Sequence, residues 1–253
     1  MKKSRIPALQ LAHATPSDRR KGRTPVKLLA IELPKSLASI VEERLRDAIV
    51  NAELSFGQAI PEGKLALGVS RTPLREALTR LELQGLVTIV PKRGTFVFKP
   101  TVGDIKQLAT FRLMLETTAL EQSLVNDKPG TVRGLIEAVR SMKAALKRRD
   151  TLAYAVADSR FHEAFFDHCG NPYLVSAFKN VSGRVAALRA HLTVPRPHEQ
   201  ARSFAEHEAI LAAFADGARK DIRQTLTEHI LRAKDVYARA LLEDVMPPAS
   251  PAS

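Results

Sequence analysis

The chain has 253 residues, 45% of them hydrophobic, so it can bury a core in one or two domains. Lysine and arginine number 39 against 27 acidic residues, and the net charge of +12 indicates a polyanionic partner, nucleic acid before an anionic membrane. The single cysteine, Cys169, excludes an intramolecular disulfide, and no apolar run approaches the roughly 18 residues of a membrane span. We expect a cytoplasmic protein with no membrane partner, although charge alone also allows a merely basic soluble protein.

Residues 1–33 form a basic segment that proline and serine interrupt and that shows no helical or strand periodicity. Eight basic and two acidic residues give this segment +6 of the net charge of +12. We predict a disordered tail here and a second one over the proline-rich residues 244–253. The basic tail either adds sequence-independent affinity for DNA or is a solvated extension.

From Ser36 onward, apolar residues recur at steps of three and four, which predicts a first helix. Two further helices and two strands are predicted, at about 61–67, 70–84, 88–90 and 95–98. The strands flank a basic hairpin tip. This order of elements predicts a winged helix-turn-helix DNA-binding domain over residues 34–100.

The third of these helices begins with polar side chains, at the place where a recognition helix meets DNA. Arg71, Thr72 and Arg75 lie within about its first turn, where base edges and phosphates are contacted. An arginine can bind guanine through two hydrogen bonds, worth about 1–3 kcal/mol of discrimination, and Thr72 suits a phosphate or a thymine methyl group. Ser70 is the predicted N-cap, because its hydroxyl can accept a hydrogen bond from the first free amides.

Two cations occupy the tip of the predicted hairpin, followed by a glycine. Lys92 and Arg93 are expected to reach the flanking DNA backbone or the minor groove, and Gly94 permits the turn between the strands. The predicted DNA contacts are therefore Ser70, Arg71, Thr72, Arg75, Lys92, Arg93 and Gly94.

The string VSRTPLREAL (Val69–Leu78), followed by GLV (Gly85–Val87) and RGTFV (Arg93–Val97), resembles the GntR family of bacterial transcriptional regulators. The resemblance covers about residues 36–99. It implies base and phosphate contacts by Arg71 and Arg75, a neighbouring contact by Thr72 and a wing tip at Gly94.

The match departs from the family pattern in the short second helix. Two residues are missing between Ala66 and Leu67, which is about half a helical turn. Gly63 also lies in this helix, where it costs about 1 kcal/mol relative to alanine. We therefore expect this helix to be shortened or rotated relative to the family pattern.

Residues 101–243 are helical in period and contain no strand signal. Six helices are predicted, at about 103–126, 130–149, 151–169, 172–193, 198–216 and 219–242. Glycine, proline and aspartate supply the breaks between them. The predicted fold is mainly α, with the winged helix-turn-helix domain followed by an all-α, six-helix bundle that binds an effector.

Four polar side chains lie on apolar stripes of this helical region. Asp158 and His162 are four residues apart and share a face of the third predicted helix, whereas His207 lies on the fifth and His229 on the sixth. Burying such groups without partners costs several kcal/mol. Three imidazoles and one carboxylate can bind a divalent transition metal, zinc first, with nickel or manganese as alternatives. The competing interpretation is that each of the four is a satisfied core residue.

The spacing of these four residues is similar to that of the metal-binding, all-helical FCD domain in the FadR subgroup of the GntR family. The resemblance covers about residues 102–242, and six helices rather than seven resemble the VanR branch. It implies that Asp158, His162, His207 and His229 bind the metal and that the metal supports a small carboxylate ligand.

Arg112 lies on the apolar stripe of the first predicted helix of the bundle. A guanidinium in such a position is expected to bind an anion, and its planar fork fits the carboxylate of an effector. Glu116, one turn further on, offers an intrahelical ion pair that needs no effector, so both interpretations stay open. Arg184 and Arg189 are further candidates for lining the pocket.

Together these patterns predict a DNA-binding transcriptional regulator of the repressor type that acts as a homodimer and is not an enzyme. A small organic acid bound at the metal-containing pocket would control its affinity for a double-stranded operator. The first alternative is a metal-dependent hydrolase with a DNA-binding appendage, since a metal with open positions can activate water. No further inward acid is expected as its general base. The second alternative is a sequence-indifferent basic DNA-binding protein whose histidines are plain core residues.

Overall fold

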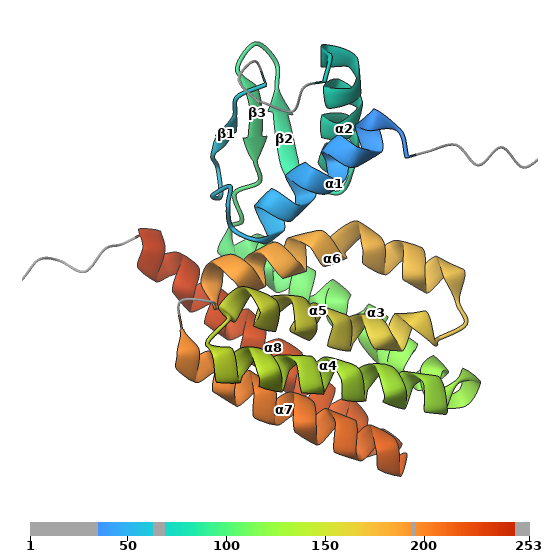
Figure 1. Cartoon of the computed structure of the whole chain (residues 1–253). Coiled ribbons are helices and arrows are strands. Elements are labelled where there is room, and N and C mark those ends of the chain that lie inside the picture. Colours follow the sequence, from blue (N-terminus) through green and yellow to red (C-terminus); the bar gives the residue numbers. More distant parts are fainter. Residues whose placement is uncertain (1–34, 63–68, 194–195, 246–253) are drawn as a thin grey trace, which may run out of the picture. The chain divides into compact units, whose positions relative to one another are not determined.

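The computed structural model describes residues 35–62, 69–193 and 196–245 (Figure 1). Within these ranges the chain forms eight helices and three short strands. None of the described helices is both long and apolar enough to cross a lipid bilayer. The predicted N-terminal tail and most of the predicted helix at 61–67, including Gly63 and the gap before Leu67, lie outside the described residues.

The predicted winged helix-turn-helix is confirmed by its first and third predicted helices and by its wing. Its described elements are α1 (Leu37–Val50), β1 (Ala59–Ile60), α2 (Arg71–Leu83), β2 (Val87–Val90) and β3 (Gly94–Val97). The strands form an antiparallel sheet in the order β1-β3-β2, in which Phe96 lies opposite both Ala59 and Thr88. β1 was not expected, because a strand of two residues carries no periodicity. The core of this part contains Leu45, Ile49, Leu78, Leu81 and Leu86.

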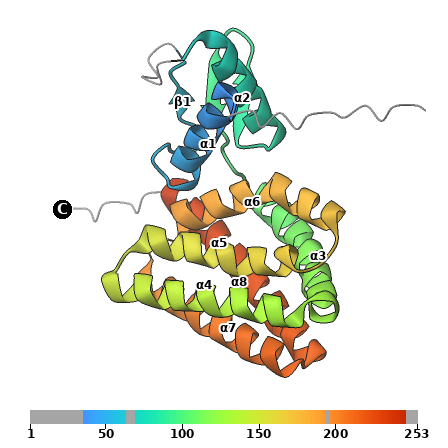
Figure 2. The same ribbon diagram turned by 45° about the vertical axis from the view of Figure 1, so that its right-hand side comes forward.

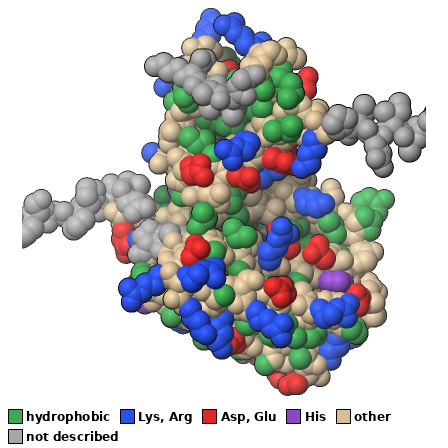
Figure 3. Space-filling model, in the orientation of Figure 1, with side chains coloured by type: hydrophobic (Ala, Val, Ile, Leu, Met, Phe, Trp, Pro, Cys, Tyr) green, Lys and Arg blue, Asp and Glu red, His purple; other side chains and the backbone are tan. Residues whose placement is uncertain are grey.

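β2 and β3 meet in a tight hairpin, and Val90 pairs with Gly94 where the strands join. Lys92 (φ +63°) and Gly94 (φ +109°) both have positive φ values. Glycine adopts this conformation readily, whereas it is uncommon for lysine. Lys92, Arg93 and Gly94 are exposed, and basic side chains gather over the hairpin tip in Figure 3.

α2 has an apolar face that packs inward and a polar beginning that faces solvent. Leu74, Ala77, Leu78 and Leu81 are buried along this face. Ser70 is at the N-cap position, but its side chain accepts no hydrogen bond from the helix, so the predicted capping interaction is wrong. Ser36, by contrast, caps α1, where its hydroxyl accepts a hydrogen bond of 3.1 Å from the amide of Ser39.

The predicted six-helix bundle is confirmed in the described residues, and each helix lies close to its predicted position. The helices are α3 (Val102–Asn126), α4 (Lys128–Arg148), α5 (Thr151–Asp167), α6 (Pro172–Leu192), α7 (Pro197–Asp216) and α8 (Arg219–Val245). Local signals set several boundaries. Thr101 and Asp104 form a capping box at the start of α3, and Gly217 ends α7 with a φ of +82°. α8 continues to Val245, into the predicted C-terminal tail.

α5 is the most enclosed helix of the bundle. It packs against α3, α4 and α6, while α3 packs along α8 and α7 contacts both α4 and α8 (Figures 1 and 2). Phe161 and Phe165 on α5 and Phe214 on α7 are fully buried in the bundle core. A polar residue on the inner face of α5 is therefore surrounded by several helices and must find its partners among their side chains.

Candidate functional site

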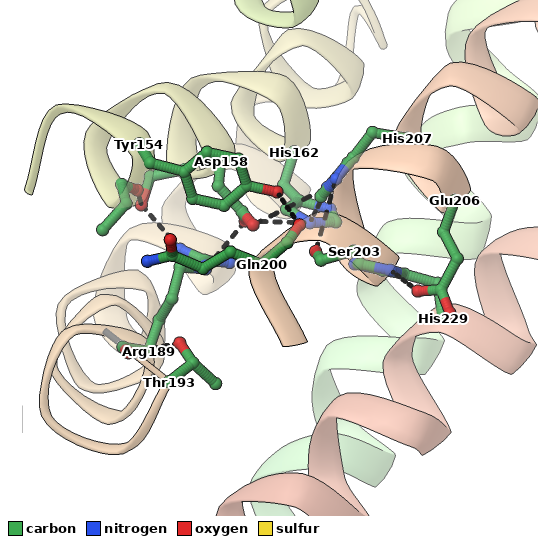
Figure 4. Close-up of polar contacts among 12 residues, drawn as sticks. Tyr154, Asp158, His162, Arg189, Thr193, Gln200, Ser203, Glu206, His207 and His229 are labelled. Carbon is green, nitrogen blue, oxygen red and sulfur yellow. Dashed lines mark hydrogen bonds and ion pairs between the residues drawn. The ribbon is translucent and has the colours of Figure 1, made fainter. Parts of the chain in front are cut away.

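Three histidines from three helices meet inside the bundle (Figure 4). His162 on α5, His207 on α7 and His229 on α8 are at most 3% exposed, and one ring nitrogen from each lies within 4.8 Å of the other two. Nε2 of His162 is 3.4 Å from Nε2 of His207. Zinc–nitrogen bonds of about 2.0–2.1 Å in a tetrahedral site place neighbouring nitrogens roughly 3.4 Å apart. The spacing of these two nitrogens therefore fits a bound metal ion.

Asp158 lies beside the histidines, but an arginine also approaches it. Its Oδ1 is 3.5 Å from Nε2 of His162, and its Oδ2 is 3.9 Å from Nε2 of His207. The same Oδ1 is 2.7 Å from Nε of Arg189 on α6. Figure 4 shows Asp158 between Arg189 and the imidazoles. The structure thus brings the predicted fourth ligand to the site, where it forms an ion pair with Arg189.

The protonation states of the site favour metal ligation. Burial lowers the pKa of His207 to about 3, and burial together with Arg112 keeps the pKa of His162 well below its usual range. Both imidazoles are therefore neutral near pH 7, and the neutral form is the one that donates a lone pair. Burial alone would raise the pKa of Asp158, but the positive charge of Arg189 holds it well below its usual range, so Asp158 is a carboxylate.

His229 is oriented by a carboxylate that was not predicted from the sequence. Nδ1 of His229 donates a hydrogen bond of 2.7 Å to Oε2 of the Glu206 carboxylate. Arg232 donates to both oxygens of Glu206, at 2.5 and 2.7 Å, and to Glu199 at 2.9 Å. Burial would raise the pKa of Glu206, but the hydrogen bonds from His229 and Arg232 lower it to about 2. With the proton on Nδ1, Nε2 of His229 carries the lone pair that a metal needs.

A second carboxylate approaches His162 from the opposite side. Nε of Arg112 donates a short hydrogen bond to Oε1 of Glu116, and Oε2 of Glu116 lies 2.8 Å from Nδ1 of His162. Glu116 is fully buried. The expectation that no further acid points inward is therefore wrong, because Glu116 and Glu206 both face the histidines. Glu116 is also the intrahelical partner proposed for Arg112.

This network leaves buried polar atoms without well-directed hydrogen bonds. Among the described residues, these atoms include Nη2 of Arg112, Oε2 of Glu116, Oδ1 of Asp158 and Nδ1 of His162. Three of the four have an oppositely charged or polar atom within 2.8 Å, but the donor does not point at the acceptor. Nη2 of Arg112 has no hydrogen-bond partner in the described part of the chain, and only Nε of its guanidinium donates to Glu116.

Two cavities reach this network. The larger, of about 690 Å³, is lined in part by Arg112, Glu116, His162 and Arg189, with apolar side chains of Leu152, Val156 and Phe178. The smaller, of about 30 Å³, is lined in part by Arg112, Asp158, Arg189, His229 and Arg232. Arg112 and Arg189 line both cavities, of which only the larger has room for a small organic molecule. Arg184 instead lines a different cavity, beside Gly85 and Lys99.

The predicted DNA-contacting residues are all on the surface. Ser70, Arg71, Thr72 and Arg75 are exposed at the beginning of α2, and Lys92, Arg93 and Gly94 are exposed at the wing tip. None of the four cations has an ion-pair partner among the described residues. Their charges are therefore free to meet phosphates or base edges.

The remaining described histidines lie away from the cluster. His168 is 2.7 Å from a carboxylate oxygen of Asp127, His191 is 3.1 Å from the carbonyl oxygen of Ile49, and the side chain of His198 is 78% exposed. Their separation from the cluster agrees with their exclusion from the predicted ligand set.

A winged helix-turn-helix followed by a helical bundle is the architecture of a class of bacterial DNA-binding transcriptional regulators. Residues 37–97 match the sequence model of bacterial regulatory proteins of the gntR family, and residues 107–232 match the FCD domain. A helix-turn-helix regulator of Agrobacterium vitis, encoded in the TAR-I ttuE-ttuC' intergenic region, is 37% identical over 124 residues, which are 47% of this chain and 72% of that protein. The chain belongs to the GntR family and carries an FCD domain.

Solved structures share the fold. A GntR regulator from Rhodococcus sp. RHA1 superposes with a TM-score of 0.72 at 24% identity, covering 81% of this chain and 99% of that one. The metal-free FCD domain of TM0439 gives a TM-score of 0.50 at 20% identity, covering 56% and 97%. Membership of the GntR family makes the protein a DNA-binding transcriptional regulator rather than an enzyme, and the hydrolase alternative is set aside. Regulators of this family bind DNA operators and typically act as dimers, and FCD domains can bind metal.

Proposed function

We propose that a small carboxylate effector, bound beside a divalent metal ion in the FCD domain, controls the affinity of this regulator for its operator. The observation that carries the proposal is the set of buried polar atoms on Arg112, Glu116, Asp158 and His162 that lack directed partners. Leaving such a group unpaired costs about 1–3 kcal/mol, and more when it is charged. A cation at Asp158 and an anion at Arg112 would supply partners to both ends of this network.

The ligands of the proposed ion are His162, His207 and His229, with Asp158 as the fourth. Three imidazoles suit zinc and nickel, and the carboxylate also admits manganese, so zinc is the first choice. The donor spacing and the neutral imidazoles support this assignment. When bound, the ion would supply a positive charge and an open coordination position for the effector.

Arg112 is the proposed effector contact. Its guanidinium is 3% exposed, lines both cavities and has an Nη2 group without a partner among the described residues. A carboxylate is the anion that matches such a fork. The apolar side chains of the larger cavity could receive the rest of a small organic acid.

The proposed DNA contacts are Arg71 and Arg75, with Thr72 and Ser70 beside them and Lys92, Arg93 and Gly94 on the wing. Their exposure on α2 and at the hairpin tip supports the assignment. We further propose a cytoplasmic homodimer of the FadR subgroup and its VanR-like branch, acting as a repressor, with domains at 34–100 and 101–243. Two copies would match the two half-sites of a palindromic operator.

A titration of labelled operator tests the effector half of this proposal. Zinc-loaded and zinc-stripped protein would be compared across a panel of small carboxylic acids, with Arg112→Gln as the variant. A true effector should shift operator affinity only in the zinc-loaded wild-type protein, where the metal and Arg112 are both present. To cause such a shift, the effector must bind the operator-binding form and the non-binding form of the regulator with different affinity. A shift that survives both zinc removal and Arg112→Gln would contradict the proposed pocket.

A further inference from the structure

Arg189 is a buried cation in contact with a proposed metal ligand. It lies on α6 and is 5% exposed, and its Nε is 2.7 Å from Oδ1 of Asp158 on α5. Its Nη1 donates a hydrogen bond of 2.7 Å to the hydroxyl of Ser159. Figure 4 shows the guanidinium on the side of Asp158 away from the imidazoles. The metal site therefore contains its own competing positive charge.

We propose that Arg189 competes with the metal ion for the carboxylate of Asp158, and that metal binding releases Arg189 toward the effector. This inference rests on the proposed metal and effector site. It assigns Arg189 the role of a positioning residue that sets the affinity for metal and links it to the affinity for the effector.

Arg189 and the metal ion would compete because both would bind the same oxygen of Asp158. Oδ1 is the Asp158 oxygen closer to an imidazole nitrogen, at 3.5 Å from Nε2 of His162, and it is also the oxygen that Arg189 approaches. A metal–carboxylate bond is about 2.0–2.2 Å long, so an ion on Oδ1 would lie within a few ångströms of the guanidinium. Two positive charges at that separation repel strongly in a buried site.

The ion pair between Arg189 and Asp158 is arranged so that a metal ion could replace Arg189. Although Nε of Arg189 is close to Oδ1, the donor does not point at the oxygen, and Oδ1 receives no well-directed hydrogen bond from the described residues. Arg189 keeps a second partner in Ser159, so it remains anchored when Asp158 turns toward an ion. The pair can therefore open without leaving Arg189 wholly unpaired.

Opening the pair prepares a site for an anion. Arg189 lines both cavities together with Arg112, so a released Arg189 gives an incoming carboxylate a second guanidinium. Metal binding should then strengthen effector binding. By thermodynamic linkage the effector must strengthen metal binding by the same factor.

Zinc affinity, measured by chelator competition on the full-length chain, tests the inference with the metal alone. Four proteins are compared: wild type, Arg189→Gln, Asp158→Asn and the double variant. Arg189→Gln should bind zinc more tightly by roughly tenfold, within the range that close pairs show in double-mutant cycles. Asp158→Asn should bind zinc more weakly, and adding Arg189→Gln to it should change little, because the competed carboxylate is gone.

The double variant separates competition from simple charge repulsion. An equal gain from Arg189→Gln in both backgrounds would show that Arg189 acts only through its charge, and unchanged or weaker zinc binding by Arg189→Gln would also overturn the inference. Arg112→Gln is the matched control, since it removes a buried arginine of the same site that does not contact Asp158, and its effect should be equal in both backgrounds.

Ser159→Ala provides a milder test if Arg189→Gln does not fold. It removes the partner that Arg189 keeps when its pair with Asp158 opens, so Arg189 should hold Asp158 more firmly and zinc binding should weaken by a smaller factor. Unchanged or tighter zinc binding would contradict the competition. A wild-type protein that takes up no zinc would refute the metal site itself. Normal zinc uptake by the wild type with unchanged affinity in Arg189→Gln and Ser159→Ala would refute the role of Arg189 alone.

Discussion

Glu206 accepts a hydrogen bond of 2.7 Å from Nδ1 of His229, and Arg232 donates to both oxygens of the same carboxylate. The side chain of His229 is 3% exposed and that of Glu206 is 22% exposed, so this pair extends from the three histidines toward solvent. The proton on Nδ1 fixes one tautomer of the ring and directs the lone pair of Nε2 at the other histidines.

Replacing Glu206 by glutamine should weaken zinc binding by about 10–100-fold, as loss of such an orienting partner does at other metal sites. Chelator competition would measure the affinity. The tautomer of His229 can be followed by nitrogen-15 NMR of the metal-free protein, where the Nδ1–H form should lose population. Glu199→Gln is the control, because Glu199 pairs with Arg232 without contacting His229. Equal losses in the two variants would argue against an orienting role.

His207→Ala or His229→Ala should abolish metal retention and weaken the effector response while operator binding persists. Each change removes one of three converging imidazoles but leaves α2 and the wing intact. Elemental analysis of the purified proteins would report the metal content. His198→Ala, which alters an exposed histidine outside the cluster, should retain the wild-type metal content. Unchanged metal content in the first two variants would rule out the assigned ligands.

Arg71→Ala and Arg75→Ala should relax sequence discrimination, since a two-hydrogen-bond contact with guanine contributes about 1–3 kcal/mol. Lys92→Ala and Arg93→Ala on the wing should instead weaken binding to all DNA sequences. Each should also reduce the slope of log affinity against log salt concentration by about one, because one phosphate contact is lost. Titrations with specific and scrambled operators at several salt concentrations would measure both effects. Arg160→Ala on α5 is an exposed-cation control. If discrimination survives both α2 changes, α2 is not the recognition helix.

The metal-stripped protein should lose stability as the pH falls below 6.5. His207 titrates near pH 3 in the folded protein and near its ordinary value of 6.5 when unfolded. Between pH 6.5 and pH 3, His207 is protonated in the unfolded chain but neutral in the folded protein. Lowering the pH through this range therefore favours the unfolded chain, and the free energy of unfolding falls. Denaturant unfolding of wild type and His207→Gln from pH 7 to 4 would test this. The variant should show a shallower decline, and parallel curves would contradict the assignment.

The helices and the three histidines could be predicted because each signal lies within one segment. Apolar periodicity and the glycine and proline breaks place α3 to α8, and the polar residues His162, His207 and His229 interrupt apolar stripes. The partners of these residues could not be found in this way, because they come from other helices. Glu116 was recognisable as an i+4 partner of Arg112, but its approach to His162 depends on how α3 packs on α5.

Other features could not be predicted because they depend on contacts between distant segments or lie on helix faces that mix polar and apolar residues. The two residues of β1 form a strand only because β3 lies beside them. Glu206 lies on a partly exposed face of α7, outside the apolar stripe, so the sequence pattern did not indicate a role for it. Arg189 lies on α6, whose apolar pattern does not rank its arginines, and only the fold brings it to Asp158.

The charges around the histidines determine what can enter together. Among the buried and half-buried side chains, Arg112, Arg189 and Arg232 contribute three positive charges. Glu116, Asp158, Glu199 and Glu206 contribute four negative ones, so the sum is −1 before the imidazoles are counted; the exposed Arg202 and Arg239, which also reach Glu206 and Glu199, are left out. A divalent cation changes this sum to +1, and one monocarboxylate returns it to zero. Because uncompensated charge is unfavourable in a buried region, uptake of the ion should favour uptake of the acid that returns the site to neutrality. The regulator would then report the simultaneous presence of a metal and a metabolite rather than the abundance of either.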